Sequence, residues 1–173
     1  MTQTYSAALP ILHLAVRILI VLNWLFGAGI LMILLATIVD PDWTFRALGI
    51  ASSTVPDMAF GLRAIPMLGL LCIPLNDLLL RRLRDIVDTV RESDPFVAAN
   101  AVRLQVIARV LLALQLVSVA IGAIADAIST SSSPLHLDAG FSVTGWLAVL
   151  LAFVLARVFA EGARMRDELT GTV

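Results

Sequence analysis

The chain has 173 residues, of which 60% are hydrophobic and 14% charged, and its mean hydropathy is +0.96. A soluble domain usually carries about a quarter charged residues, so a single water-soluble core is excluded and a bilayer is the expected solvent. The net charge of −1 gives no general attraction to nucleic acid, and the single cysteine, Cys72, excludes an intrachain disulfide.

Four apolar segments are long enough to cross a bilayer. The first, residues 18–39, is uncharged and reaches the roughly 20 residues that a membrane-spanning helix needs. The others cover about 60–80, 104–128 and 140–159. Pro66 and Pro74 remove backbone donors from the second segment and predict a kink there. We therefore predict a single domain over residues 1–173, with an all-α, integral membrane, four-helix transmembrane bundle fold.

The arginines predict the orientation of these helices. Two of them, Arg46 and Arg63, fall on one side of the predicted membrane. The others fall on or near the opposite side: Arg17, Arg81, Arg82, Arg84, Arg91, Arg103, Arg109, Arg157, Arg164 and Arg166. Because cytoplasmic loops carry the excess of basic residues, the arginine-rich side and both termini are predicted to be cytoplasmic.

The predicted cytoplasmic loop, residues 81–103, contains helical signals. An apolar stripe recurs at helical spacing through Leu79, Leu83, Ile86, Val87 and Val90. Oppositely charged residues stand four apart, as in Arg81 and Asp85. The second helix is therefore predicted to extend into the cytoplasm, with a break and restart at Asp94 and Pro95.

Two interpretations of the apolar stripe stay open. It packs against its own hairpin partner or the bilayer surface, or it docks a cytosolic protein. Arg81, Arg82 and Arg84 beside the membrane also attract anionic lipid. Direct nucleic-acid binding is not expected, because interleaved aspartates such as Asp85 and Asp88 cancel the basic patch.

Two ionisable residues are predicted at membrane depth. Asp77 lies about one turn inside the second span, and Arg109 lies at comparable depth in the third. A charged group in a bilayer is costly, so we predict that Asp77 and Arg109 pair, with Asn76 nearby. The alternative is that both side chains reach the interface separately.

The fourth span carries small residues at intervals of four: Gly140, Thr144, Ala148, Ala152, Ala156 and Ala160. Small residues allow helices to approach closely in lipid, so this ridge predicts packing against a neighbouring helix. A homodimer face is the alternative, so a homo-oligomer remains an open expectation.

No enzyme motif is present: HExxH, GxSxG, CxxC, Walker and GxGxxG patterns are all missing. His13 and His136 are predicted on opposite sides of about 30 Å of hydrocarbon, so they cannot share a metal ion. We expect a protein that is not an enzyme and binds no cofactor. A small transporter or channel subunit is the alternative, because Asp77 and two prolines lie in one spanning helix.

Two motifs carry a resemblance to a known family. The loop contains Asp94-Pro95-Phe96, Asn100 and Arg103-Leu104, and the last part of the chain contains residues 157–169 followed by Thr172-Val173. Both resemble the bacterial four-helix membrane family catalogued as domain of unknown function 2975. The resemblance covers nearly the whole chain and implies a place in the bacterial cytoplasmic (inner) membrane.

The family has no established activity, and its members resemble one half of a two-gene arrangement. The other half is often a small helix-turn-helix DNA-binding protein. The resemblance thus implies a non-enzymatic regulator that binds or restrains a cytosolic transcription factor. With the apolar stripe added, the candidate partner face is Leu83, Val87, Phe96, Asn100, Arg103, Arg166 and Asp167. The alternative is that these residues fix the cytoplasmic ends of the helices.

Overall fold

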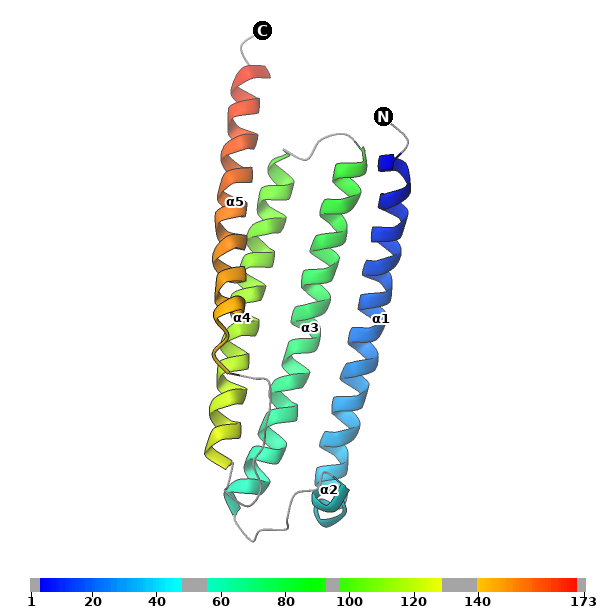
Figure 1. Cartoon of the computed structure of the whole chain (residues 1–173), viewed down its shortest axis with the longest axis vertical. Coiled ribbons are helices and arrows are strands. Elements are labelled where there is room, and N and C mark those ends of the chain that lie inside the picture. Colours follow the sequence, from blue (N-terminus) through cyan, green and yellow to red (C-terminus); the bar gives the residue numbers. More distant parts are fainter. Residues whose placement is uncertain (1–3, 48–55, 93–96, 129–139, 171–173) are drawn as a thin grey trace.

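The computed structural model describes residues 4–47, 56–92, 97–128 and 140–170 (Figure 1). Its helices are α1 (Thr4–Val39), α2 (Pro41–Ala47), α3 (Pro56–Glu92), α4 (Ala98–Ile128) and α5 (Val143–Thr170), and the described residues contain no strand. Four of them are long and apolar enough to cross a membrane, over Leu12–Val39, Phe60–Thr89, Ala98–Ile128 and Val143–Arg166. The predicted all-α class with four spans is confirmed.

The helices extend further than the predicted spans. α3 continues through Pro66 and Pro74 and on to Glu92, so the predicted extension of the second span is confirmed. α4 begins at Ala98 rather than near residue 104. The predicted restart at Asp94 and Pro95 lies outside the described residues.

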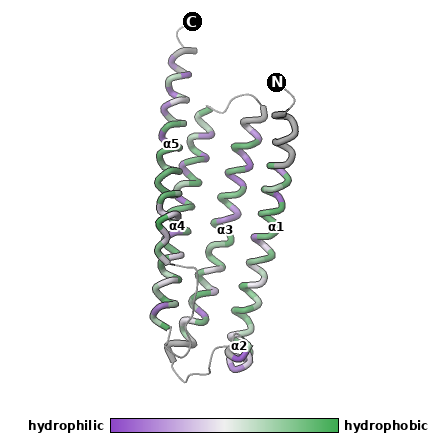
Figure 2. The backbone as a smooth tube through the Cα atoms, viewed as in Figure 1, coloured by the Kyte–Doolittle hydropathy of each residue, from purple (hydrophilic) through white to green (hydrophobic). Residues whose placement is uncertain are grey.

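The four long helices lie in a row rather than a closed ring (Figure 1). Within the described chain, the extensive packing is between α1 and α3, α3 and α4, and α4 and α5, while the short α2 packs on α1. The edge helices α1 and α5 therefore expose large apolar side chains such as Met32 and Leu150, at 71% and 60%. Figure 2 shows these apolar stretches along the row, and in a bilayer they contact lipid chains.

Small residues set the close contacts between neighbours. A Cβ atom at Gly27 of α1 would lie 3.0 Å from Ile73 of α3, and one at Gly61 of α3 would lie 2.6 Å from Ile128 of α4. Gly145 of α5 likewise lies directly against the side chain of Gln115. Helix association in lipid depends on such close approach, because burying apolar surface gives little drive there.

α5 is displaced along α4. The backbone N–H of Gly140, just before α5, donates to Ser118 Oγ at 3.3 Å. Ser118 lies ten residues before the last residue of α4, Ile128, which is about 15 Å of helix. The other end of α5 runs past the beginning of α4 (Figure 1).

The predicted small-residue ridge is not the packed face of α5. Ala156 is buried, but Thr144, Ala148 and Ala160 are exposed. The buried residues are instead seven apart, at Val149, Ala156 and Ala163. Steps of four residues rotate by about 40° each around a helix, whereas steps of seven stay within about 20°, so only the second pattern follows a straight neighbour.

Candidate functional site

The arginine-rich end of the row is where α1 begins, α3 ends, α4 begins and α5 ends. Both termini lie at this end (Figure 1). The positions of its charged side chains relative to the apolar parts of the helices follow from contacts between the helices.

A hydrogen-bonded clamp joins α3 to α4 at this end. Nη1 of Arg103 donates to Asn100 Oδ1 at 2.8 Å, to the backbone carbonyl of Asp85 at 3.1 Å, and to Thr89 Oγ1. The Thr89 hydroxyl in turn donates to the same Asp85 carbonyl at 2.7 Å. Asn100 is fully buried. The clamp ties the last turns of α3 to the first turn of α4.

The clamp changes the interpretation of the predicted partner face. Because Asn100 is 0% exposed, it cannot touch a partner, and Arg103 is engaged within the chain. These two positions fit the alternative that they fix the helix ends. The sequence offered only a short polar motif at these positions, which could not distinguish contact with a partner from fixing the helix ends.

The remaining predicted partner residues do not form one surface. Leu83 is 36% exposed and Val87 is half-buried, both on α3, whereas Arg166 is exposed on α5. α3 and α5 are separated by α4 in the row. Phe96 and the side chain of Asp167 lie outside the described residues.

Asp77 pairs with Arg81 of its own helix, and the structure does not bring it to Arg109. Its Oδ2 lies 2.7 Å from Arg81 Nε, and its Oδ1 accepts a hydrogen bond from Trp24 Nε1 of α1 at 3.3 Å. Arg109 is exposed on α4 and has no ion pair among the described residues. Asp77 faces α1 and not α4, so the Asp77–Arg81 pair replaces the predicted one.

Contacts between α1 and α3 fix the depth of their arginines. His13 Nδ1 lies 3.2 Å from Asp88 Oδ1, and Trp24 reaches Asp77. Arg17, between His13 and Trp24, is therefore level with the stretch of α3 between Asp77 and Asp88.

Arginines from three neighbouring helices consequently share one level, which we call the arginine layer. Its members are Arg17, Arg81, Arg82, Arg84 and Arg109. Arg109 belongs to it because the clamp holds Arg103, six residues earlier, level with Asp85. Beyond this layer α1 has no charged residue over 18–39, so in a bilayer the arginine layer lies at the headgroups.

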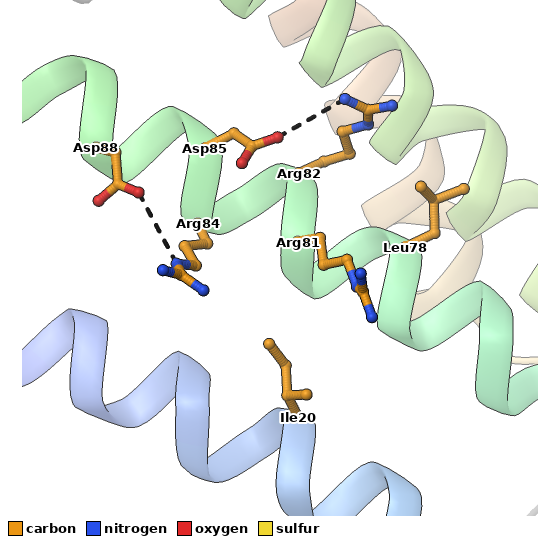
Figure 3. Close-up of a pocket in the computed structure, with 7 residues that line it drawn as sticks. All are labelled: Ile20, Leu78, Arg81, Arg82, Arg84, Asp85 and Asp88. Carbon is orange, nitrogen blue, oxygen red and sulfur yellow. Dashed lines mark ion pairs between the residues drawn. The ribbon is translucent and has the colours of Figure 1, made fainter.

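A charged groove of about 590 Å³ opens between α1 and α3 at this level (Figure 3). It is lined by Ile20, Leu78, Arg81, Arg82, Arg84, Asp85 and Asp88. Arg82 Nη1 is 3.7 Å from Asp85 Oδ2, and Arg84 Nε is 3.8 Å from Asp88 Oδ2. The sequence indicated the charges but not the groove, because Ile20 comes from a distant segment.

A second groove, the α4–α5 groove, lies at the same end. It has a volume of about 300 Å³ and is lined by Ala101, Val102, Gln105, Phe153, Ala156, Arg157 and Ala160. Val102 and Phe153 are 61% and 37% exposed. Further along α5, Arg164 pairs with Glu161 at 2.8 Å and with Glu168 at 3.6 Å on the helix surface.

The arrangement is suited to binding by charge and apolar contact. Within the described parts of the chain, no three His, Cys, Asp or Glu side chains gather closely enough to hold a metal ion. The arginine layer instead offers planar guanidinium donors, which match carboxylate and phosphate oxygens.

Comparison with known proteins gives one match. No curated protein and no solved structure matches the chain. A family described as Protein of unknown function (DUF2975) matches residues 46–173, which include α3, α4 and α5 but not α1. This confirms the resemblance drawn from the loop and tail motifs: the chain belongs to the DUF2975 family.

Proposed function

We propose that the protein is a non-enzymatic regulator in the bacterial cytoplasmic membrane, with its arginine-rich end in the cytoplasm. There it binds or restrains a small cytosolic helix-turn-helix DNA-binding protein. The observation that carries the proposal is the displacement of α5, which runs past the start of α4 (Figure 1). Met165 and Arg166 in this part of α5 are exposed. The excess of arginines at this end supports the orientation.

The docking surface is the α4–α5 groove with the adjoining end of α5. Val102 is next to Arg103, which donates a hydrogen bond to Thr89 of α3. Thr89 lies eight residues, or about 12 Å of helix, beyond Arg81 of the arginine layer. Val102 therefore lies beyond the arginine layer, on its cytoplasmic side in this proposal. Exposed apolar side chains rimmed by charges are typical of protein-binding surfaces, and Met165 on α5 is 54% exposed.

The test is affinity purification in mild detergent, with bound proteins identified by mass spectrometry. The wild type should recover a helix-turn-helix protein. Val102→Asp and Met165→Asp should each recover about tenfold less, because an interface that buries an unpaired charge is strongly weakened. The matched control is Leu83→Asp on α3, which should keep the partner.

Two outcomes contradict this proposal. Failure of the wild type to recover any DNA-binding protein removes the regulator function. Loss of the partner in Leu83→Asp, with retention in Val102→Asp and Met165→Asp, moves docking from α5 to α3.

The second candidate function is a small transporter or channel subunit. It is favoured by the non-helical backbone at Gly140–Ser142, which lies against Ser118 about 15 Å inside the end of α4. At membrane depth, irregular backbone is tolerated only where protein buries it or where it lines a water-filled cavity. Solute flux in proteoliposomes that falls in Ser118→Leu or Asp77→Asn would support transport over regulation.

A further inference from the structure

Another groove between α1 and α3, which we call the amide groove, shares no residue with the charged groove of Figure 3. Asn76 of the amide groove and Leu78 of the charged groove are two residues apart and point about 200° from each other around α3, so the two grooves flank this helix on different sides. The amide groove has a volume of about 480 Å³. It is lined by Leu19, Leu22, Asn23 and Phe26 of α1 and by Asn76, Leu79 and Leu80 of α3.

The two asparagines of the amide groove carry hydrogen-bonding capacity that the described chain does not use. Asn23 donates from Nδ2 to the backbone carbonyl of Ile73 at 3.0 Å, and its Oδ1 accepts no hydrogen bond from any described residue. Within the same part of the chain, neither Nδ2 nor Oδ1 of Asn76 has a partner. None of these three atoms is among the buried side-chain atoms without a partner, so all three are accessible from outside. The groove therefore offers two acceptor oxygens and one donor nitrogen.

Both amides lie deeper in the membrane than the headgroups. Asn76 is five residues from Arg81 and Asn23 is six residues from Arg17, which places them about 7.5 and 9 Å of helix inward from the arginine layer. The headgroup region adds about 5–7 Å on each side of the hydrocarbon, so the amides lie near the hydrocarbon boundary. Water is scarce at this depth and acyl chains form no hydrogen bonds. The unused amide atoms are therefore suited to a polar group of another molecule.

The lining of the amide groove indicates an uncharged ligand without a phosphate. No lining residue is ionisable. Leu19, Leu79 and Leu80 lie between the amides and the arginine layer, so a phosphate placed above the amides would face leucine side chains.

The amide atoms also indicate which polar group the ligand carries. An ester carbonyl only accepts, so it would pair with Asn76 Nδ2 and leave both amide oxygens without a donor. A hydroxyl donates and accepts, so a single hydroxyl pairs with Asn76 Nδ2 and with one amide oxygen at the same time.

We propose that the amide groove binds a neutral lipid with a free hydroxyl at the membrane interface, the diacylglycerol class. Its hydroxyl accepts a hydrogen bond from Asn76 Nδ2 and donates one to an amide oxygen of the groove. Its acyl chains run inward past Leu22 and Phe26, which are 53% and 68% exposed.

The test is native mass spectrometry of the delipidated full-length protein. It is titrated with a diacylglycerol and with the acetyl ester of the same diacylglycerol, which keeps the acyl chains and carbonyls but lacks the hydroxyl donor. The wild type should retain one diacylglycerol about tenfold more tightly than the acetyl ester, because the ester leaves the amide oxygens unpaired in an apolar groove. Equal or tighter retention of the acetyl ester overturns the proposal without any variant.

The variant Asn76→Leu locates the site, because it keeps an apolar side chain of similar size and removes the amide. It should retain the two lipids equally, at the level at which the wild type retains the acetyl ester. Its helix content by circular dichroism should match the wild type, since Asn76 makes no side-chain hydrogen bond within the described chain. Gln105→Leu, which removes an exposed amide from the α4–α5 groove, is the matched control and should keep the tenfold preference.

Two results with the variant overturn the proposal. The first is a preference for the hydroxyl that persists in Asn76→Leu. The second is a dimer mass in the lipid-free wild type that disappears in Asn76→Leu, because a second copy of the chain would then be the partner of this amide.

Discussion

The clamp between α3 and α4 predicts a large stability loss from a single substitution, Arg103→Met. Methionine keeps an apolar stem but removes the donor to Asn100, Asp85 and Thr89. A hydrogen bond from a charged group contributes about 1.5–3 kcal/mol, and a buried acceptor left without its donor costs about 1–3 kcal/mol. Thr89 still donates to the Asp85 carbonyl, so the loss falls mainly on Asn100. We expect about 3 kcal/mol, or roughly a hundredfold in the unfolding equilibrium.

The assay is reversible unfolding in mixed micelles, followed by far-ultraviolet circular dichroism. Arg164→Met is the matched control, because Arg164 has the same side chain at the same end but is 67% exposed in its ion pairs. Exposed pairs contribute about 0–1 kcal/mol, so the control should unfold nearly as the wild type does. Equal stability of the two variants would refute the clamp. Partner loss in Arg103→Met at unchanged stability would return Arg103 to the docking face.

Two further predictions test helix packing and depth. Gly61→Ala should destabilise the protein by about 1–3 kcal/mol in the same assay, because its Cβ would lie 2.6 Å from Ile128. Adding Ile128→Ala to the same chain should recover part of that loss, and no recovery would show that Gly61 does not contact Ile128. The control Gly29→Ala, with nothing within 4 Å of its Cβ, should be neutral or stabilising. Cysteines at positions 115 and 145, in an otherwise cysteine-free chain, should cross-link in membranes, and a pair at 125 and 145 should not. The reverse result would show that α5 begins level with the outer end of α4.

The sequence was sufficient for the spanning segments because the bilayer imposes a length and a composition on each one. It also predicted the continuation of α3, since the apolar stripe and charges four apart persist to Val90. The predicted spans were shorter than the helices, because hydropathy falls at the first arginines while the helices continue. For this reason the predicted third span began only after Arg103, whereas α4 begins at Ala98.

The candidate site was predicted less well, because it depends on which helices are neighbours. The charge of Asp77 does require a partner, but the choice between Arg109 and Arg81 depends on the side of α3 that Asp77 faces. The buried state of Asn100 likewise depends on the position of α3 relative to α4. Local periodicity in the sequence encodes neither the side of α3 that Asp77 faces nor the position of α3 relative to α4. The depth of a charged residue in the membrane also does not identify the residue with which it pairs.

The open row and the charged groove between α1 and α3 depend on the same packing. Each tight small-residue contact joins consecutive long helices: Gly27 with Ile73, and Gly61 with Ile128. α5 joins the row through Gly145. Lipid gives edge helices little drive to close a ring, so α1 keeps a single long neighbour and its groove with α3 stays open to the bilayer. Were α1 to pack against α5 instead, the arginines of the groove would face a protein interior. They would then require carboxylate partners closer than the 3.7 and 3.8 Å observed.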